Sequence, residues 1–308
     1  MTRFEKSAWL YLAYLAGVIL LGAWVRISGS GAGCGSHWPT CNGEIIPLAP
    51  SIKTLTEYAH RVTSGLCGIF GIALVIWARR VNPWVLRAAL ASLFFVLVEG
   101  FIGAVLVKKE LVANDTSASR ALVIALHLGN TLLLTASTAA MAWWAGTRRA
   151  SVLTVSRSLV LAALLALVLT SMTGAITALG DTLFPRQPAL SGDLLAEVRG
   201  DLSPSQHFLV RLRALHPAVA LAAAGLVGYL LLAAEATPWV IAGRIALAFQ
   251  VLFGFANIAL GAPGWMQILH LLNSQVVWVL MVVLRLSAGR PAQPVSRARP
   301  MAAVLSDR

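Results

Sequence analysis

Charge is scarce in this sequence. Asp, Glu, Lys and Arg make up 12% of the 308 residues, whereas hydrophobic residues make up 58%. So few polar side chains cannot cover the surface of one soluble domain, and the composition therefore predicts an integral membrane protein. Acidic residues are especially few, at 12 against 24 basic ones. The basic residues fall in short loops between apolar runs, which is typical of topology signals, so we expect no nucleic-acid partner.

Cysteine is also rare, with three in the chain. This number excludes a disulfide-rich scaffold and a four-cysteine zinc site. Cys67 lies inside an apolar run and is predicted to be a small packing residue. Cys34 and Cys41 share one loop, which the charge distribution places on an oxidising face. We favour a disulfide between them over two free thiols or a metal pair, because no other cysteine lies on that side.

Long apolar runs dominate what is present. Each has about the 20 residues that a helix needs to cross a bilayer, and strands of a barrel would instead alternate apolar and polar residues. No small-residue cleavage site ends the first run, so we expect a membrane helix there and not a cleaved signal. The eight runs are 8–25, 57–77, 84–107, 120–145, 158–179, 210–234, 239–261 and 264–286.

The loop charges predict the orientation. Placing both termini in the cytoplasm leaves most Lys and Arg residues on the inner side. The loop 26–56 then lies outside the cytoplasm. The second, fourth, sixth and eighth runs all pass from outside to inside.

The chain repeats a short set of residues. Each half contains paired histidines, a glycine ahead of the first one, and an Asn three residues after the second. We infer two pseudo-symmetric, parallel four-helix bundles related by duplication, covering residues 1–148 and 149–308. The matched pairs are Gly22 with Gly174, His60 with His216, Glu99 with Gln250, Gly103 with Gly254, His127 with His270, and Asn130 with Asn273.

The four repeated histidines lie at one depth, three to seven residues into outward-to-inward runs. An ionisable ring inside a bilayer is costly and marks a functional site. Haem iron takes two axial ligands, so two pairs of histidines predict two bis-histidine haem sites. The alternative for a single histidine is a hydrogen bond to a neighbouring helix. His37 and His207 lie in outer loops and are expected to be exposed to solvent.

One position distinguishes the two halves. Glu57 precedes His60 by three residues, and Arg213 precedes His216 by three, so each shares a helix face with its histidine. A carboxylate beside a macrocycle can exchange a proton or stabilise developing positive charge, whereas a guanidinium suits a haem propionate. The first half is thus predicted to be reactive. A helix N-terminal acid and a partner for Arg61 are the alternatives for Glu57.

These motifs together resemble the haem A synthase family. The resemblance rests on the Gly-Cys-x-x-x-Trp-Pro-x-Cys loop of residues 33–41, on the run Glu57-Tyr-Ala-His60-Arg61 and on His270-Leu-Leu-Asn273, and it extends over all eight runs. Members convert haem O to haem A by successive hydroxylation of the C8 methyl group, and the resulting gem-diol loses water to give a formyl group.

The resemblance implies roles for single residues. His60 and His127 would hold the substrate haem, and His216 and His270 would ligate a haem b. Glu57 would be the catalytic acidic residue. Cys34 and Cys41 match a pair that is usually disulfide-bonded in one class of members.

The resemblance also implies a setting. The protein would lie in a bacterial inner membrane, receive haem O from a haem O synthase, deliver haem A to terminal oxidase assembly, and exchange electrons with a quinol or another carrier. A di-haem electron carrier without cofactor chemistry is the main alternative, and a transporter with parallel repeats is a more distant one.

Three positions depart from the family pattern. Glu99 stands where a glutamine is expected, and Pro217 stands where an arginine is common. The segment 179–208 is long for this family's loop and contains several acidic residues. We expect it to be a solvated loop, with a cap over the second haem or a partner contact as alternatives.

Overall fold

The computed structural model describes residues 1–146, 156–186, 188 and 194–287. The predicted boundary between residues 148 and 149 lies outside these residues, as does Asp193. Within the described residues the chain is helical apart from turns, loops and one isolated bridge between Cys41 and Glu44. The prediction of an all-helical membrane protein is confirmed.

Eight helical spans in the described residues are long and apolar enough to cross a membrane, as predicted. Seven are single helices, and α7, η2 and α8 follow one another to form the remaining span. A short helix, α6 (Leu194–Asp201), precedes that span. The bounds are α1 Arg3–Ile27, α2 Ile52–Ala78, α3 Pro83–Lys108, α4 Ala118–Ala145, α5 Arg157–Leu183, α7 Phe208–Arg211, η2 Leu212–Ala214, α8 Leu215–Ala233, α9 Pro238–Ala259 and α10 Gly264–Ser287.

Capping side chains fix where six of the long helices begin. In each case a Ser, Thr or Asn side chain accepts a hydrogen bond from the backbone N–H three residues later, which satisfies one of the free donors of the first turn. In α3 and α9 a proline follows the cap, where its missing N–H is harmless. The capping residues are Thr2, Ser51, Asn82, Ser117, Ser156 and Thr237.

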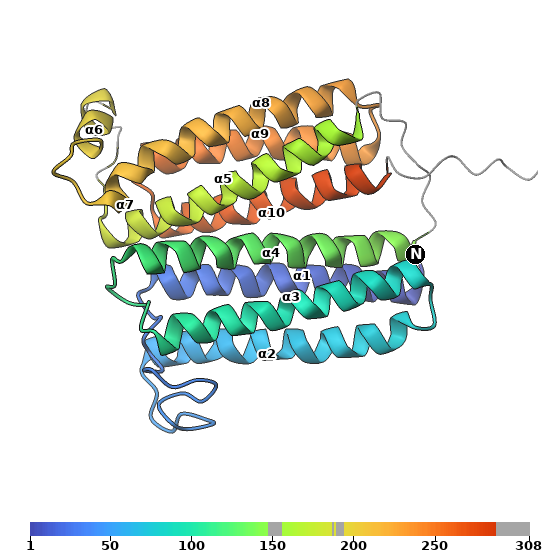
Figure 1. Cartoon of the computed structure of the whole chain (residues 1–308), viewed down its shortest axis with the longest axis horizontal. Coiled ribbons are helices and arrows are strands. Elements are labelled where there is room, and N and C mark those ends of the chain that lie inside the picture. The colour runs from blue at the N-terminus through green and yellow to red at the C-terminus, as the bar shows by residue number, and fades with distance from the viewer. Residues whose placement is uncertain (147–155, 187, 189–193, 288–308) are drawn as a thin grey trace, which may run out of the picture.

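The helices form two contacting groups (Figure 1). Helices α1 to α4 pack against one another, and so do α5, α8, α9 and α10. Helix α4 lies against α5 and α10, and α1 also contacts α10, so these four helices join the groups. The two four-helix halves, residues 1–148 and 149–308, and their origin by duplication stay predictions.

The outer surface of the helices is apolar. Along α3, Leu90, Phe94, Leu97 and Phe101 follow helical spacing, and each is about half exposed or more. Such a stripe would be unstable in water but suits the hydrocarbon of a bilayer. We therefore describe the chain as a multi-pass membrane protein.

A hydrogen bond between the two groups gives a test of how they are held. The indole Nε1 of Trp278 on α10 donates to the carbonyl oxygen of Leu132 on α4 at 2.9 Å, and Trp278 is buried. We expect Trp278→Phe to lower stability by about 1 kcal/mol, because the ring remains but the interhelical bond is lost. Thermal unfolding of the purified protein measures this. Trp265→Phe, at an exposed tryptophan, is the matched control and should leave the transition unchanged.

Candidate functional site

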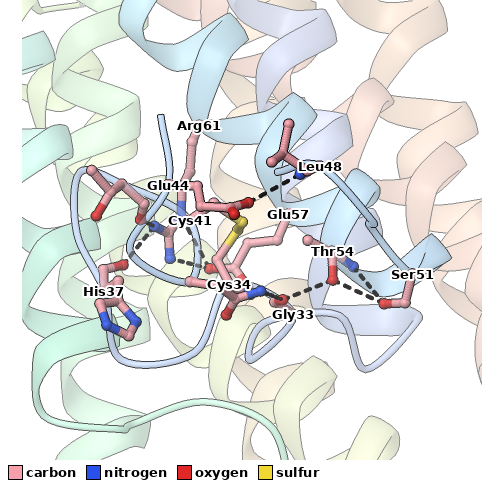
Figure 2. Close-up of a disulfide and its surroundings, with 12 residues drawn as sticks. Gly33, Cys34, His37, Cys41, Glu44, Leu48, Ser51, Thr54, Glu57 and Arg61 are labelled. Carbon is pink, nitrogen blue, oxygen red and sulfur yellow. Dashed lines mark hydrogen bonds and ion pairs between the residues drawn. A yellow bond between two sulfur atoms is a disulfide. The ribbon is translucent and has the colours of Figure 1, made fainter. Parts of the chain in front are cut away.

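A disulfide closes the loop between α1 and α2. Cys34 and Cys41 are joined by an S–S bond of 2.01 Å, and both are buried. Backbone hydrogen bonds between Cys41 and Glu44, and from Asn42 N–H to the Cys34 carbonyl, fold the loop tightly around it. Figure 2 shows this loop lying over the first turns of α2. Because both cysteines are buried, the disulfide is packed inside the loop.

Glu57 lies beneath this loop and is 4% exposed. Its Oε2 accepts a hydrogen bond from the backbone N–H of Cys34 at 2.9 Å. Its Oε1 accepts from Nε of Arg61 at 3.1 Å and also contacts the Nη2 of Arg61. Figure 2 shows Glu57 and Arg61 pointing from α2 toward the loop. The structure therefore contains the Arg61 pairing considered as an alternative, and the catalytic role of Glu57 stays a prediction.

Arg61 extends the connection to the other side of the loop. Its Nη1 donates to the carbonyl oxygens of His37 and Thr40, at 2.6 and 2.7 Å. The ring of His37 itself is exposed, as predicted. One carboxylate and one guanidinium on successive turns of α2 thus hold the disulfide loop against the membrane helices.

His60 lies one turn after Glu57 and packs against α1. A Cβ on Gly22 would lie 2.8 Å from Cε1 of His60, so only glycine leaves room for the ring at this point. His60 and His127 are close enough to interact electrostatically. The buried Nδ1 of His60 has no hydrogen-bond partner among the described residues. The structure thus brings His60 and His127 into one region, and their role as haem ligands stays a prediction.

His127 on α4 faces a carboxylate on α3. Its Nδ1 lies 2.5 Å from Oε2 of Glu99, and the hydroxyl of Thr131 donates to Oε1 of the same carboxylate at 2.8 Å. The side-chain amide of Asn130 donates to the carbonyl of Phe95, at 3.0 Å. Glu99, left without a role by the sequence, therefore belongs to the environment of the first pair of histidines.

The second pair of histidines has a matching frame. His216 packs on Gly174, where a Cβ would lie 2.9 Å from its Cε1, and His270 packs on Gly254, at 3.4 Å. The two ring centroids are 6.5 Å apart. A metal bonded to both rings at about 2 Å would separate the centroids by roughly 6 Å. The geometry of His216 and His270 therefore fits bis-histidine ligation of a haem iron.

His216 has a partner that His60 lacks. Its Nδ1 lies 3.2 Å from the hydroxyl of Thr173, and that hydroxyl donates its own proton to the carbonyl of Thr170 at 2.9 Å. The hydroxyl oxygen is then left to accept from Nδ1–H, a tautomer that would leave Nε2 of the ring available to a metal. Leu21 precedes Gly22 where Thr173 precedes Gly174, so the first half offers no such hydroxyl.

Arg213 is buried in an ion-pair network at the outer end of α5. Its Nε lies 3.1 Å from Oδ1 of Asp181, and its Nη2 donates to the carbonyls of Gly180, at 3.0 Å, and Phe184. Asp201 lies farther off, at 3.9 Å. These bonds fasten α5 to η2 and α6. The role of Arg213 toward a haem propionate stays a prediction, because its guanidinium already has these protein partners.

Parts of the segment 179–208 are more ordered than the expected solvated loop. Asp181 is buried and pairs with both Arg186 and Arg213. His207 is not simply exposed, because its Nδ1 accepts from the backbone N–H of Leu209 and its ring stacks on Phe184. The acidic residues there neutralise buried arginines, which a count of charges along the sequence could not show.

Sequence reasoning missed two residues that the structure brings to these sites. Thr173 could have been found, because it is the polar neighbour of a repeated glycine. Arg26 was assigned only to a loop, yet it donates to the carbonyl of Ala178 at 2.6 Å and to Oε1 of Gln267 at 3.0 Å. No local pattern in the sequence indicates contacts across more than 150 residues.

The sequence matches a known protein family. The model of the COX15-CtaA family, described as cytochrome oxidase assembly protein, matches residues 6–282. The chain belongs to this family. The match extends from the first turn of α1 to the last turns of α10, and the predicted membership in the haem A synthase family is confirmed.

Curated relatives of the chain carry two different names. A protein named Protoheme IX farnesyltransferase from Thermus thermophilus is 45% identical over 304 residues, which cover 93% of this chain and 48% of that protein. Proteins named Heme A synthase from Alkalihalophilus pseudofirmus and Symbiobacterium thermophilum are 39% and 38% identical over 115 and 118 residues, about a third of each chain. The chain spans about half the length of the Thermus relative.

Proposed function

We propose that this protein is a haem A synthase, which oxidises the C8 methyl group of haem O to a formyl group. The observation that carries the proposal is the pair of matched histidine sites, only one of which lies beside a loop-covered carboxylate. Family membership supports the same reaction, since relatives at 37–39% identity are named Heme A synthase.

In this proposal the two histidine pairs bind different haems. His60 and His127 hold the substrate haem in the outer part of the first group of helices, and His216 and His270 hold a haem b in the second. Gly22 and Gly174 give the leading histidine of each pair the room that its ring needs. When bound, the iron of each haem supplies the redox chemistry of the site.

Glu57 is placed for acid and base chemistry next to the substrate. It lies one turn outward from His60, and the disulfide loop covers it from water. In this position it takes a proton released when the methyl carbon is hydroxylated. With water as the oxygen source, each hydroxylation breaks one C–H bond, forms one C–O bond and releases two protons and two electrons, and the electrons leave to an external acceptor. The two successive hydroxylations give an alcohol and then a gem-diol, which loses water to leave the aldehyde.

The proposed setting is a bacterial inner membrane with both termini in the cytoplasm and the disulfide loop outside. The Thermus relative, whose name describes farnesyl transfer to protohaem IX, supports a haem O synthase as the source of substrate. The family description supports delivery of the product to cytochrome oxidase assembly. The electrons removed from the methyl group pass to a quinone, which becomes a quinol, or to another carrier.

Haem extraction tests this function. We expect the purified protein, co-expressed with a haem O synthase in a host that lacks haem A, to contain about one haem b and a smaller amount of haem O or haem A. Pyridine haemochrome spectra and chromatography of the extracted haems measure these amounts. Two haems b and no haem A in the host membranes would instead identify an electron carrier.

A further inference from the structure

Two equivalent histidines in the two halves have partners of different charge. In the first half, Oε2 of Glu99 lies 2.5 Å from Nδ1 of His127. In the second half, the side-chain amide nitrogen of Gln250 lies 3.2 and 3.4 Å from the two ring nitrogens of His270. A carboxylate thus stands where its counterpart is a neutral amide.

One part of the surrounding frame is shared by the two halves. Asn130 donates to the carbonyl of Phe95 at 3.0 Å, and Asn273 donates to the carbonyl of Ala246 at 2.8 Å. Each of these carbonyls lies four residues before the Glu or Gln in question. The asparagine bonds are therefore matched, while the side chain four residues after each carbonyl is charged in the first half and neutral in the second.

Hydrogen bonds hold each of these side chains in place. The Thr131 hydroxyl donates to Oε1 of Glu99 at 2.8 Å, which leaves Oε2 directed at His127. In the second half, Asn273 donates to Oε1 of Gln250 at 2.9 Å. The carboxylate of Glu99 therefore lies against Nδ1 of His127 as an ion-pair contact, without an aligned hydrogen bond, and Nε2 is the ring nitrogen left for a metal.

We propose that Glu99 is a positioning residue that acts through His127 and makes it a more electron-donating axial ligand than His270. A carboxylate that accepts the Nδ1 proton of a ligating histidine fixes the ring orientation and raises its basicity. A more basic ligand stabilises ferric over ferrous iron, so the first-half haem has the lower reduction potential of the two. The inference rests on the proposed function for the identity of the haem in the first half.

The two haems would therefore differ in reduction potential and in their part in electron transfer. Glu99 makes electron loss easier at the site where the methyl group is oxidised. Gln250, being neutral, leaves the haem of the second half at a higher potential, suited to accepting electrons. Glu57 and Glu99 then act on different sides of the same substrate site, one beside His60 and the other on His127.

Exchange of the two side chains tests the inference. The protein is loaded with protohaem, and variants are made in a His216→Ala background, which isolates the first-half haem. We expect Glu99→Gln to raise the reduction potential of that haem, to change its low-spin electron paramagnetic resonance signal, and to weaken haem binding about 10- to 100-fold. Glu99→Asp, which keeps the charge, should restore part of the potential difference.

If the first-half site of the variants binds no haem, the reciprocal substitution at Gln250 still tests the inference. In an otherwise unchanged protein, Gln250→Glu should lower the potential of the second-half haem. Glu110→Gln, at an exposed glutamate just beyond α3, is the control for loss of one negative charge. Unchanged potentials and spectra in Glu99→Gln or in Gln250→Glu would overturn the inference. These readouts need no conversion of haem O, so a shift in potential without haem A would reject the proposed function alone.

Discussion

Glu57→Gln is expected to lower haem A formation by about 10²- to 10⁴-fold, the range for loss of a positioned acid or base, while the haem content stays at the parental level. Glutamine keeps the shape of the side chain and an oxygen that accepts from the Cys34 N–H, but it cannot take a proton. Extraction of haems from membranes of the variant measures both quantities. Haem A at the parental rate would show that Glu57 has no chemical role.

The ion pair with Arg61 offers a matched control for this experiment. If Glu57 served only to hold the loop, removal of its partner in Arg61→Met would have the same effect on activity. We expect Arg61→Met to retain more activity than Glu57→Gln, and to loosen the loop, which faster reduction of the Cys34–Cys41 disulfide by a water-soluble thiol would report. Equal activity losses in the two variants would assign Glu57 to the loop.

Gly174→Ala is expected to remove most of the haem from the second half. The added Cβ would lie 2.9 Å from Cε1 and 3.3 Å from Nδ1 of His216, so the ring must move away from its position. Displacement of an axial ligand or of its orienting partner lowers metal affinity about 10- to 100-fold. Haem b per protein, measured by pyridine haemochrome after purification, gives the result.

Substitutions at two other glycines serve as comparisons for Gly174→Ala. Gly225→Ala on α8 is the control, since nothing lies within 4 Å of a Cβ built there, and it should retain haem b. Gly22→Ala, whose Cβ would lie 2.8 Å from His60, should retain haem b but lose haem O. A Gly174→Ala protein with full haem b and an unchanged spectrum would mean that His216 is not a ligand.

The sequence predicted the membrane helices well because bilayer thickness sets their length. The helix ends were harder to predict. The second span was predicted to begin at residue 57, whereas Ser51 caps α2 at Ile52. Five polar or isolated apolar residues therefore precede the apolar run inside the helix. Hydropathy measures the apolar core of a span and not its capped first turns. In α2 these first turns lie against the disulfide loop.

The candidate site was predictable where it depended on local spacing. Glu57 and Arg61 are four residues apart on a helix, so their pairing could be considered from the sequence alone. The bond from the Cys34 N–H to Glu57 could not, because it depends on how the loop folds back. Arg213 shows the same limit, since its partner Asp181 is 32 positions earlier and belongs to another helix.

The repeat predicted more than the motifs did. Matching the halves led to Gly22, Gly174 and Gly254, all of which contact a histidine ring in the structure. Gly103, the counterpart of Gly254, has nothing within 4 Å of a Cβ built on it. His127 lies instead toward Glu99. The two halves therefore differ at this position, where His127 contacts a carboxylate and His270 contacts a glycine.

Helix α1 contributes to both sites at once. Gly22 touches His60, and one turn later Arg26 is bonded to Ala178, one turn beyond Gly174, and to Gln267, three residues before His270. A tilt of α1 that changes the space around His60 therefore also displaces the backbone that supports both histidines of the second pair. If the two histidine pairs hold haems as proposed, binding at one site would alter the geometry of the other through α1.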